Sequence, residues 1–141
     1  MAVLASVASL MFTACQKKAA AHTAEHPATV EQIEGSDLKR VTLTARAMER
    51  IDLKTDEVRE QRVSPAASPQ RVVPYSSLIY DPQGKTWVYT SPQPGSFVRH
   101  SVEVDYIEGD LVALKDGPPT GTVVASRAVA ELYGAEAKLG H

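Results

Sequence analysis

Apolar and polar residues alternate most regularly between residues 97 and 107. In an extended strand successive side chains point to opposite faces, so this alternation predicts a long, half-buried β-strand. The residues expected on its apolar face are Val98, His100, Val102, Val104 and Tyr106. Those expected on the opposite face are Arg99, Ser101, Glu103 and Asp105.

Shorter stretches on both sides have a similar composition and are separated by turn residues. Residues 86–90 are rich in aromatic and β-branched types, which favour strands. Residues 81–85 contain proline and then glycine, an order typical of a tight turn. Further strands are predicted at residues 38–43, 53–58, 78–80, 111–114 and 122–125.

One short helix is predicted between residues 44 and 51. Thr44 is a common N-cap residue, because its hydroxyl can accept a hydrogen bond from a free backbone N–H of the first turn. Ala47 or Met48, together with Ile51, would form an apolar stripe at the three- and four-residue spacing of a helix.

These elements predict a mainly β fold: a small antiparallel β-roll or barrel-like domain with one short helix. Residues 59–70 are polar and contain Pro65 and Pro69, so they are expected to form an exposed connector. On either side lie a strand-helix-strand segment, residues 37–62, and a longer β domain, residues 71–134. The two segments are either halves of one small domain or a short module beside a longer one.

The amino-terminal residues have a different pattern. Residues 2–12 are uncharged and mostly apolar, a run of signal-peptide length that is too short to cross a bilayer as a helix. Thr13 and Ala14 then precede Cys15, and this resembles a bacterial lipobox, in which the cysteine is lipidated on sulfur. Phe12 stands where a lipobox usually has an aliphatic residue, and no Lys or Arg precedes the run. The alternative interpretation is a buried helix with a structural cysteine.

Lipidation of Cys15 would place the protein in the cell envelope. Residues 1–14 would be a lipoprotein signal peptide, and two acyl chains would anchor the protein to the outer face of the cytoplasmic membrane. Residues 15–36 have no sustained apolar period and are expected to form a flexible tether. Cys15 is the only cysteine of the sequence, so no intramolecular disulfide can form.

Composition and charge exclude several classes of protein. The chain has 141 residues, of which 43% are hydrophobic and 23% charged, as in an ordinary globular domain. A formal net charge of −2 offers no basic surface for nucleic acid. Ser76 and Ser77 do not stand in a nucleophile motif with a histidine and an acid, so neither an enzyme nor a cofactor is expected.

Three histidines are weak candidates for metal binding. His22 and His26 would lie on one face of a helix, but Pro27 argues against a preformed site there. His100 could titrate near neutral pH, although a packing residue is the simpler interpretation. No metal site is therefore predicted.

Two charged residues are candidates for contact with a partner. Arg99 is expected either to pair with a cross-strand acid or to contact another protein. Asp110 belongs to the tight turn at residues 108–110 and would lie at the rim of a hairpin.

Two stretches of the chain resemble the periplasmic adaptor subunits, or membrane fusion proteins, of resistance-nodulation-division efflux pumps. The stretch similar to their opening segment contains Arg40-Val41-Thr42-Leu43-Thr44, Ala47, Arg50-Ile51 and Thr55. The stretch similar to their carboxy-terminal membrane-proximal domain contains Val73-Pro74-Tyr75-Ser76-Ser77-Leu78, Gly84-Lys85-Thr86-Trp87-Val88-Tyr89, Phe97-Val98-Arg99, Val102, Gly109-Asp110 and Gly117-Pro118-Pro119-Thr120-Gly121-Thr122-Val123-Val124. Together they cover about two-thirds of the chain.

The resemblance implies an accessory, lipid-anchored module that binds a protein, namely a transmembrane efflux transporter. In the family a lipoyl-like domain and an α-helical hairpin separate the two stretches, whereas here only residues 59–70 join them. Two alternatives stay open. One is a surface lipoprotein that binds a metal ion or small ligand, and the other is a truncated adaptor remnant without an independent role.

Overall fold

The computed structural model describes residues 25–66 and 68–139 of the chain. The elements in chain order are β1 (Ala28–Gln32), β2 (Lys39–Leu43), α1 (Ala45–Arg50), β3 (Lys54–Glu57), β4 (Arg59–Gln61), β5 (Gln70–Pro74), the 3₁₀ turn η1 (Tyr75–Ser77), β6 (Ile79–Tyr80), β7 (Thr86–Gln93), β8 (Ser96–Glu108), β9 (Leu111–Asp116), β10 (Val123–Arg127) and α2 (Val129–Leu139). The fold is mainly β, as the sequence predicts. No helix within the described ranges is long and apolar enough to cross a membrane.

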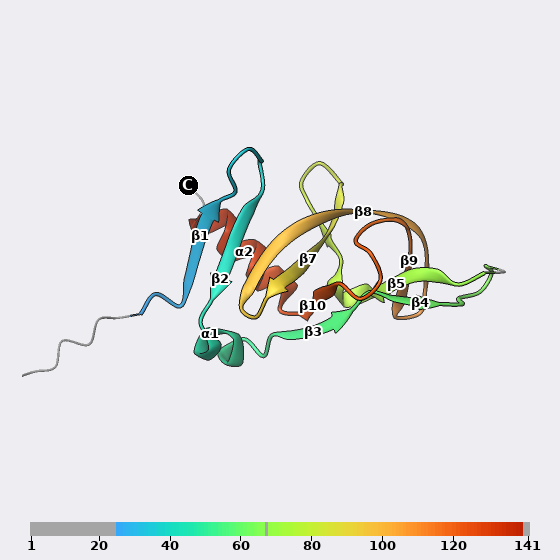
Figure 1. Ribbon diagram of the computed structural model, residues 1–141, viewed down its shortest axis with the longest axis horizontal. Helices are drawn as coiled ribbons and strands as arrows, with labels where there is room; N and C mark the ends of the chain where they lie inside the picture. Colours follow the sequence, from blue (N-terminus) through green and yellow to red (C-terminus); the bar gives the residue numbers. More distant parts are fainter. Residues whose placement is uncertain (1–24, 67, 140–141) are drawn as a thin grey trace, which may run out of the picture.

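The strands form one curled antiparallel sheet in the order β3-β10-β7-β8-β9-β5-β4. β2 joins β1 to β8, and β6 pairs with β7. β8 bonds to β2 and β7 along its first part and to β9 along its last part. Figure 1 shows β8 arching from β2 and β7 over to β9. The predicted antiparallel, barrel-like architecture and its longest strand are therefore confirmed.

The central strands have a hydrophobic core on each face. The core on the side of α2, here the helix-covered core, consists of Val41, Leu43, Tyr89, Phe97, Ala125, Val129 and Leu132. The core on the other side, here the sheet-covered core, consists of Val58, Val73, Val88, Val102, Val112, Leu114 and Val124. Adjacent residues of β10 enter different cores, because successive side chains of a strand alternate between faces.

The single apolar face predicted for residues 98–106 is wrong at His100, which is exposed, and again beyond Val104. The pairing of β8 with β9 shifts register on both sides of Val104, which marks β-bulges. A bulge bends a strand and changes which face the following side chains occupy. Tyr106 therefore packs against a small third cluster with Val72 and Ala113, while Val104 packs against the sheet-covered core.

Helix α1 lies where the sequence predicts it. The backbone N–H of Ala47 donates to Thr44 Oγ1 at 3.1 Å, so Thr44 is the predicted N-cap. Met48 and Ile51 pack against the helix-covered core. The β7–β8 turn lies next to α1 and contains Gly95, whose φ of +78° favours glycine. A side chain at Gly95 would also come too close to the Leu43 carbonyl.

The tether predicted over residues 15–36 overlaps a strand, so that prediction is wrong for residues 28–32. β1 pairs with β2, with Val30 opposite Val41. Ala28 and Val30 alternate with polar residues and pack against the helix-covered core, which explains why this segment is ordered into the sheet. The predicted signal peptide, Cys15 and His22 lie outside the described residues.

The connector predicted over residues 59–70 also contains structure. Its two ends, β4 and the first residue of β5, pair with each other. Between them Val63 is buried, and its carbonyl accepts a hydrogen bond from the Tyr106 hydroxyl at 2.8 Å. β2 pairs with β8, and β3 with β10. The two predicted segments are therefore halves of one sheet.

Helix α2 (Val129–Leu139) is not predicted from the sequence. This helix places Val129 and Leu132 in the helix-covered core and contacts β1 and β2. Much of it consists of small or charged residues, so its apolar stripe is too short to be distinctive in the sequence.

Candidate functional site

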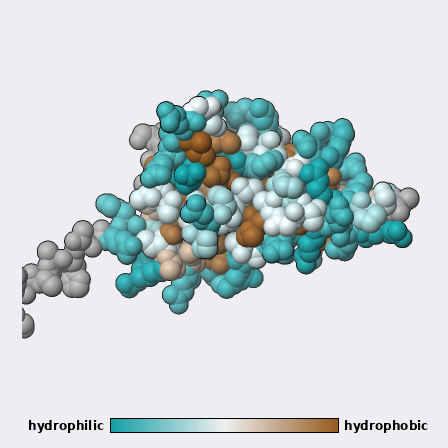
Figure 2. All heavy atoms as spheres, in the orientation of Figure 1, coloured by the Kyte–Doolittle hydropathy of each residue, from teal (hydrophilic) through white to brown (hydrophobic). Residues whose placement is uncertain are grey.

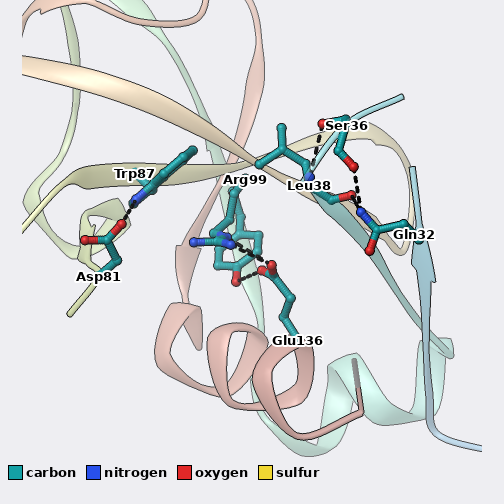
Figure 3. Close-up of polar contacts among 8 residues, drawn as sticks. Gln32, Ser36, Leu38, Asp81, Trp87, Arg99 and Glu136 are labelled. Atoms are coloured by element: carbon teal, nitrogen blue, oxygen red, sulfur yellow. Dashed lines mark hydrogen bonds and ion pairs between the residues drawn. The ribbon is translucent and has the colours of Figure 1, made fainter. Parts of the chain in front are cut away.

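Arg99 is largely buried and belongs to a polar cluster beneath α2. Its Nη2 lies 2.9 Å and its Nε 3.0 Å from Glu136 Oε1. The Tyr89 hydroxyl donates to the other carboxylate oxygen, Glu136 Oε2, at 2.6 Å. Figure 3 shows Arg99, on β8, and Glu136, on α2, pointing toward each other. The Glu136 side chain is only 5% exposed, so both oxygens of a buried carboxylate are satisfied.

Aromatic rings enclose the guanidinium of Arg99. Its Cζ lies 4.8 Å from the centroid of the Trp87 ring and 5.7 Å from that of Tyr133, within cation–π range. Trp87 is itself oriented by a hydrogen bond from its Nε1 to Asp81 Oδ2 at 2.9 Å, drawn in Figure 3. The cluster therefore holds the guanidinium on several sides.

Two groups of the cluster have shifted pKa values. Burial, together with the hydrogen bond to the Glu136 carboxylate, raises the pKa of the Tyr89 phenol above its ordinary value. Burial of Asp81 would raise its pKa, but hydrogen bonds from Trp87 and from two turn N–H groups outweigh it and lower that pKa. Tyr89 therefore stays a hydrogen-bond donor, and Asp81 stays an acceptor, at neutral pH.

This arrangement acts as a clamp between α2 and the sheet. Both oxygens of Glu136 are occupied, and the guanidinium is enclosed by rings, so the charged groups have little capacity left for a ligand. Arg99 pairs with an acid on α2 rather than on a neighbouring strand, so the prediction of a cross-strand pair is wrong. Contact between Arg99 and another protein stays a prediction. Glu136 has no local motif that would identify it in the sequence, because its partner Arg99 lies 37 residues away.

Asp110, the other predicted contact residue, is exposed at the tip of the β8–β9 hairpin. Its carbonyl accepts a hydrogen bond from the backbone N–H of Tyr75 at 2.8 Å, which brings η1 beside the hairpin. Two large apolar side chains are exposed nearby: Tyr75 is 48% exposed, and Ile107, which precedes the turn, is 46% exposed. We call Tyr75, Ile107, Glu108, Gly109 and Asp110 the hairpin rim.

The hairpin rim combines two of the three exposed large hydrophobic side chains among the described residues with acidic ones; the third is Tyr80 on β6. On the face drawn in Figure 2, hydrophobic residues form small groups within a largely hydrophilic surface. An exposed aromatic and an exposed aliphatic side chain beside acidic residues have the composition of a small protein-contact patch. The sequence indicates Asp110 through its turn, whereas the exposure of Tyr75 and Ile107 depends on how β5 and β9 pair.

The histidines of the described residues are separate from one another. His26 is exposed before β1, and His100 is exposed on β8, where its Nδ1 lies 2.8 Å from the Ser101 carbonyl. The prediction that His100 is a packing residue is therefore wrong. Within residues 25–66 and 68–139, no group of three or more His, Cys, Asp or Glu side chains is arranged to hold a metal ion.

Comparison with protein-family models and with curated proteins finds no match for this chain.

Proposed function

We propose that this chain is a lipid-anchored extracytoplasmic module that binds another protein, an efflux transporter of the cytoplasmic membrane. It would act as an accessory protein rather than as an enzyme. The proposal combines the lipobox-like residues before Cys15 with the resemblance to periplasmic adaptors.

The observation that carries the proposal is the pairing of the two adaptor-like stretches. They are separated in the chain by residues 59–70, yet β2 bonds to β8 and β3 bonds to β10. A membrane-proximal adaptor domain needs this arrangement, because its two parts flank the inserted domains in the sequence. The pairing therefore supports the resemblance more strongly than the separate motifs do.

The two ends of the module indicate which part of a transporter it would meet, namely a part that stands out from the membrane. Figure 1 places β1, the first described strand, at one end of the long axis and the β4–β5 loop toward the other. An anchored module of this shape would present that loop and β9 away from its tether.

The hairpin rim is the proposed contact. Interfaces concentrate binding energy in a few aromatic or aliphatic anchors surrounded by polar groups, and Tyr75 and Ile107 beside Asp110 have this arrangement. Arg99 is left out of the contact because its guanidinium is held within the clamp.

Photo-crosslinking in native membranes tests the proposed contact. A photoreactive phenylalanine analogue would replace Tyr75 in the full chain, and Arg46 on α1, toward the opposite end of the molecule in Figure 1, would be the matched control. We expect a membrane transporter to be captured from position 75 and not from position 46. Ile107→Asp should reduce this product about fivefold to tenfold, since truncated interface anchors cost more than ~1 kcal/mol.

Equal capture of abundant bystanders from both positions would count against the proposal. The anchor is tested separately with Cys15→Ser, which should release the protein from the membrane fraction and prevent lipid labelling. Unchanged membrane association of the Cys15→Ser variant would contradict the part of the proposal that makes this chain a lipoprotein.

A further inference from the structure

A groove lies between α1, the start of β3 and the β7–β8 turn, away from both the clamp and the hairpin rim. Its volume is about 540 Å³, within the range of ligand-binding clefts. Met48, Leu53, Phe97 and Val123 line it with apolar surface. The groove is thus large enough for a few residues of an extended chain and has an apolar lining for a side chain.

The wall formed by the β7–β8 turn is held in place. Gly95 has no side chain, and its carbonyl accepts a hydrogen bond from the Leu43 N–H at 2.8 Å. A Cβ at this glycine would stand 2.8 Å from the Leu43 carbonyl oxygen, so the close approach of turn and β2 depends on glycine. Pro92 and Pro94 further restrict the turn, and the groove is therefore largely preformed.

One side of the groove is the edge strand β3. Among the described strands β3 pairs only with β10. The N–H of Val58 bonds to the Thr122 carbonyl, and Asp56 stands opposite Val124. Because alternate residues of an antiparallel pair face their neighbour, the backbone of Thr55 faces away from β10. Thr55 also lines the groove, so a peptide lying along this edge would bond to its outward-facing N–H and carbonyl.

The charge along the groove favours a cation. Asp52 is already paired with Lys54 at 2.8 Å and with Arg127. Glu49 also lines the groove, and its carboxylate has no ion-pair or hydrogen-bond partner among the residues that the structure describes. Lys54 and Arg127 thus balance Asp52, and Glu49 is left as the carboxylate of the groove that can pair with a cation.

We infer that this groove binds an extended peptide segment of a partner protein, with an apolar side chain in the groove and a basic residue beside Glu49. The edge of β3 supplies main-chain hydrogen bonds to the peptide. The apolar lining packs against the peptide's apolar side chain, and the unpaired carboxylate of Glu49 binds its basic side chain. The inference goes beyond the proposed function, because it requires neither the lipid anchor nor the hairpin rim.

Three blocked peptides of matched length test the inference: acetyl-Thr-Leu-Lys-Thr-amide and its counterparts with Gln or Glu in place of Lys. Each is titrated into the ¹⁵N-labelled full chain carrying Cys15→Ser, and amide shifts are followed by NMR. We expect saturable shifts at Leu53, Thr55 and Ser91, with the Lys peptide binding about two- to fivefold more tightly than the Gln peptide. The Glu peptide should bind most weakly.

Two substitutions separate the charge from the strand edge. Glu49→Gln should abolish the preference for Lys without changing the affinity for the Gln peptide, whereas Glu31→Gln on β1 is the matched control and should change nothing. Thr55→Pro removes the outward N–H but not the bonds to β10, and should weaken all three peptides. Shifts elsewhere, no saturation by ~10 mM, or a Lys preference that survives Glu49→Gln would each overturn the inference.

Discussion

The two faces of the central sheet are stabilised in different ways. The sheet-covered core consists of six valines and one leucine, all aliphatic. The helix-covered core contains Tyr89 and Phe97 as well, and beside it lies the buried pair of Arg99 and Glu136. β-Branched residues at alternate positions suffice to pack strand against strand, whereas a helix lying across a sheet can slide or rotate. The polar clamp restricts α2 to one position.

The largest expected effect comes from breaking the clamp. Glu136→Ala leaves the Arg99 guanidinium and the Tyr89 hydroxyl without their acceptor, so the free energy of unfolding should fall by about 3–5 kcal/mol. Urea denaturation followed by circular dichroism measures this. Glu131→Ala, at an exposed position of the same helix, should cost less than ~0.5 kcal/mol. Equal losses for the two variants would show that the clamp contributes nothing specific.

Matched truncations of the two cores sharpen the comparison. Leu132→Ala in the helix-covered core and Leu114→Ala in the sheet-covered core should each cost about 2–5 kcal/mol, because both remove buried methyl groups and leave a cavity. Hydrogen exchange should separate them: Leu132→Ala should speed exchange of α2 amides selectively. If Leu114→Ala speeds exchange in α2 as much, the two cores are not independent.

High pH should destabilise the protein through Tyr89, a group with no counterpart in the sheet-covered core. Its pKa is raised in the folded state, so its contribution is fully present below the ordinary value of 10.0. Above that pH the unfolded state loses a proton that the folded state keeps, so the free energy of unfolding should fall by up to ~1.4 kcal/mol per pH unit. Tyr89→Phe should remove this component of the slope, and Tyr80→Phe, at an exposed tyrosine, should not.

The smallest effects are expected at ion pairs on the surface near each core. Hydrogen bonds from Lys54 and Arg127 lower the pKa of Asp52, and Glu103 raises the pKa of Lys115. Asp52→Asn and Glu103→Gln should hardly change the melting temperature at pH 7, because exposed pairs contribute little. The Asp52 contribution is present above its ordinary pKa of 3.8 and is lost as pH falls through the lowered value. A difference that persists at about pH 2 would contradict this origin.

Several parts of the fold could be predicted because their causes are local. Thr44 caps α1 through a bond to Ala47, three residues away. The turn at residues 81–85 closes because Asp81 accepts hydrogen bonds from Gln83 and Lys85. Each of these contacts lies within a short window of sequence, so residue type and spacing were enough to predict it.

The candidate site could be predicted only in part. Asp110 was identified because a Gly-Asp turn between two strands is visible in the sequence. Its neighbours on the hairpin rim were missed, because Tyr75 reaches the turn through a hydrogen bond that joins η1 to a distant hairpin. Arg99 was assigned to the surface because alternation alone cannot show which face a helix covers.

The sequence by itself determined that this is a mainly β protein with a capped short helix, Gly- and Pro-containing turns and one long strand. These features follow from side-chain periodicity and backbone preference. Only the tertiary structure decided that β1 joins the sheet, that bulges in β8 divide its side chains among separate clusters, and that Arg99 is bound by Glu136. The Arg99–Glu136 contact joins residues far apart in the chain. β1 and the bulges of β8 pair with neighbouring strands, but they are stabilised by distant contacts, such as Val30 against the helix-covered core and the Tyr106 hydroxyl on the Val63 carbonyl. No local pattern encodes the free energy of such contacts.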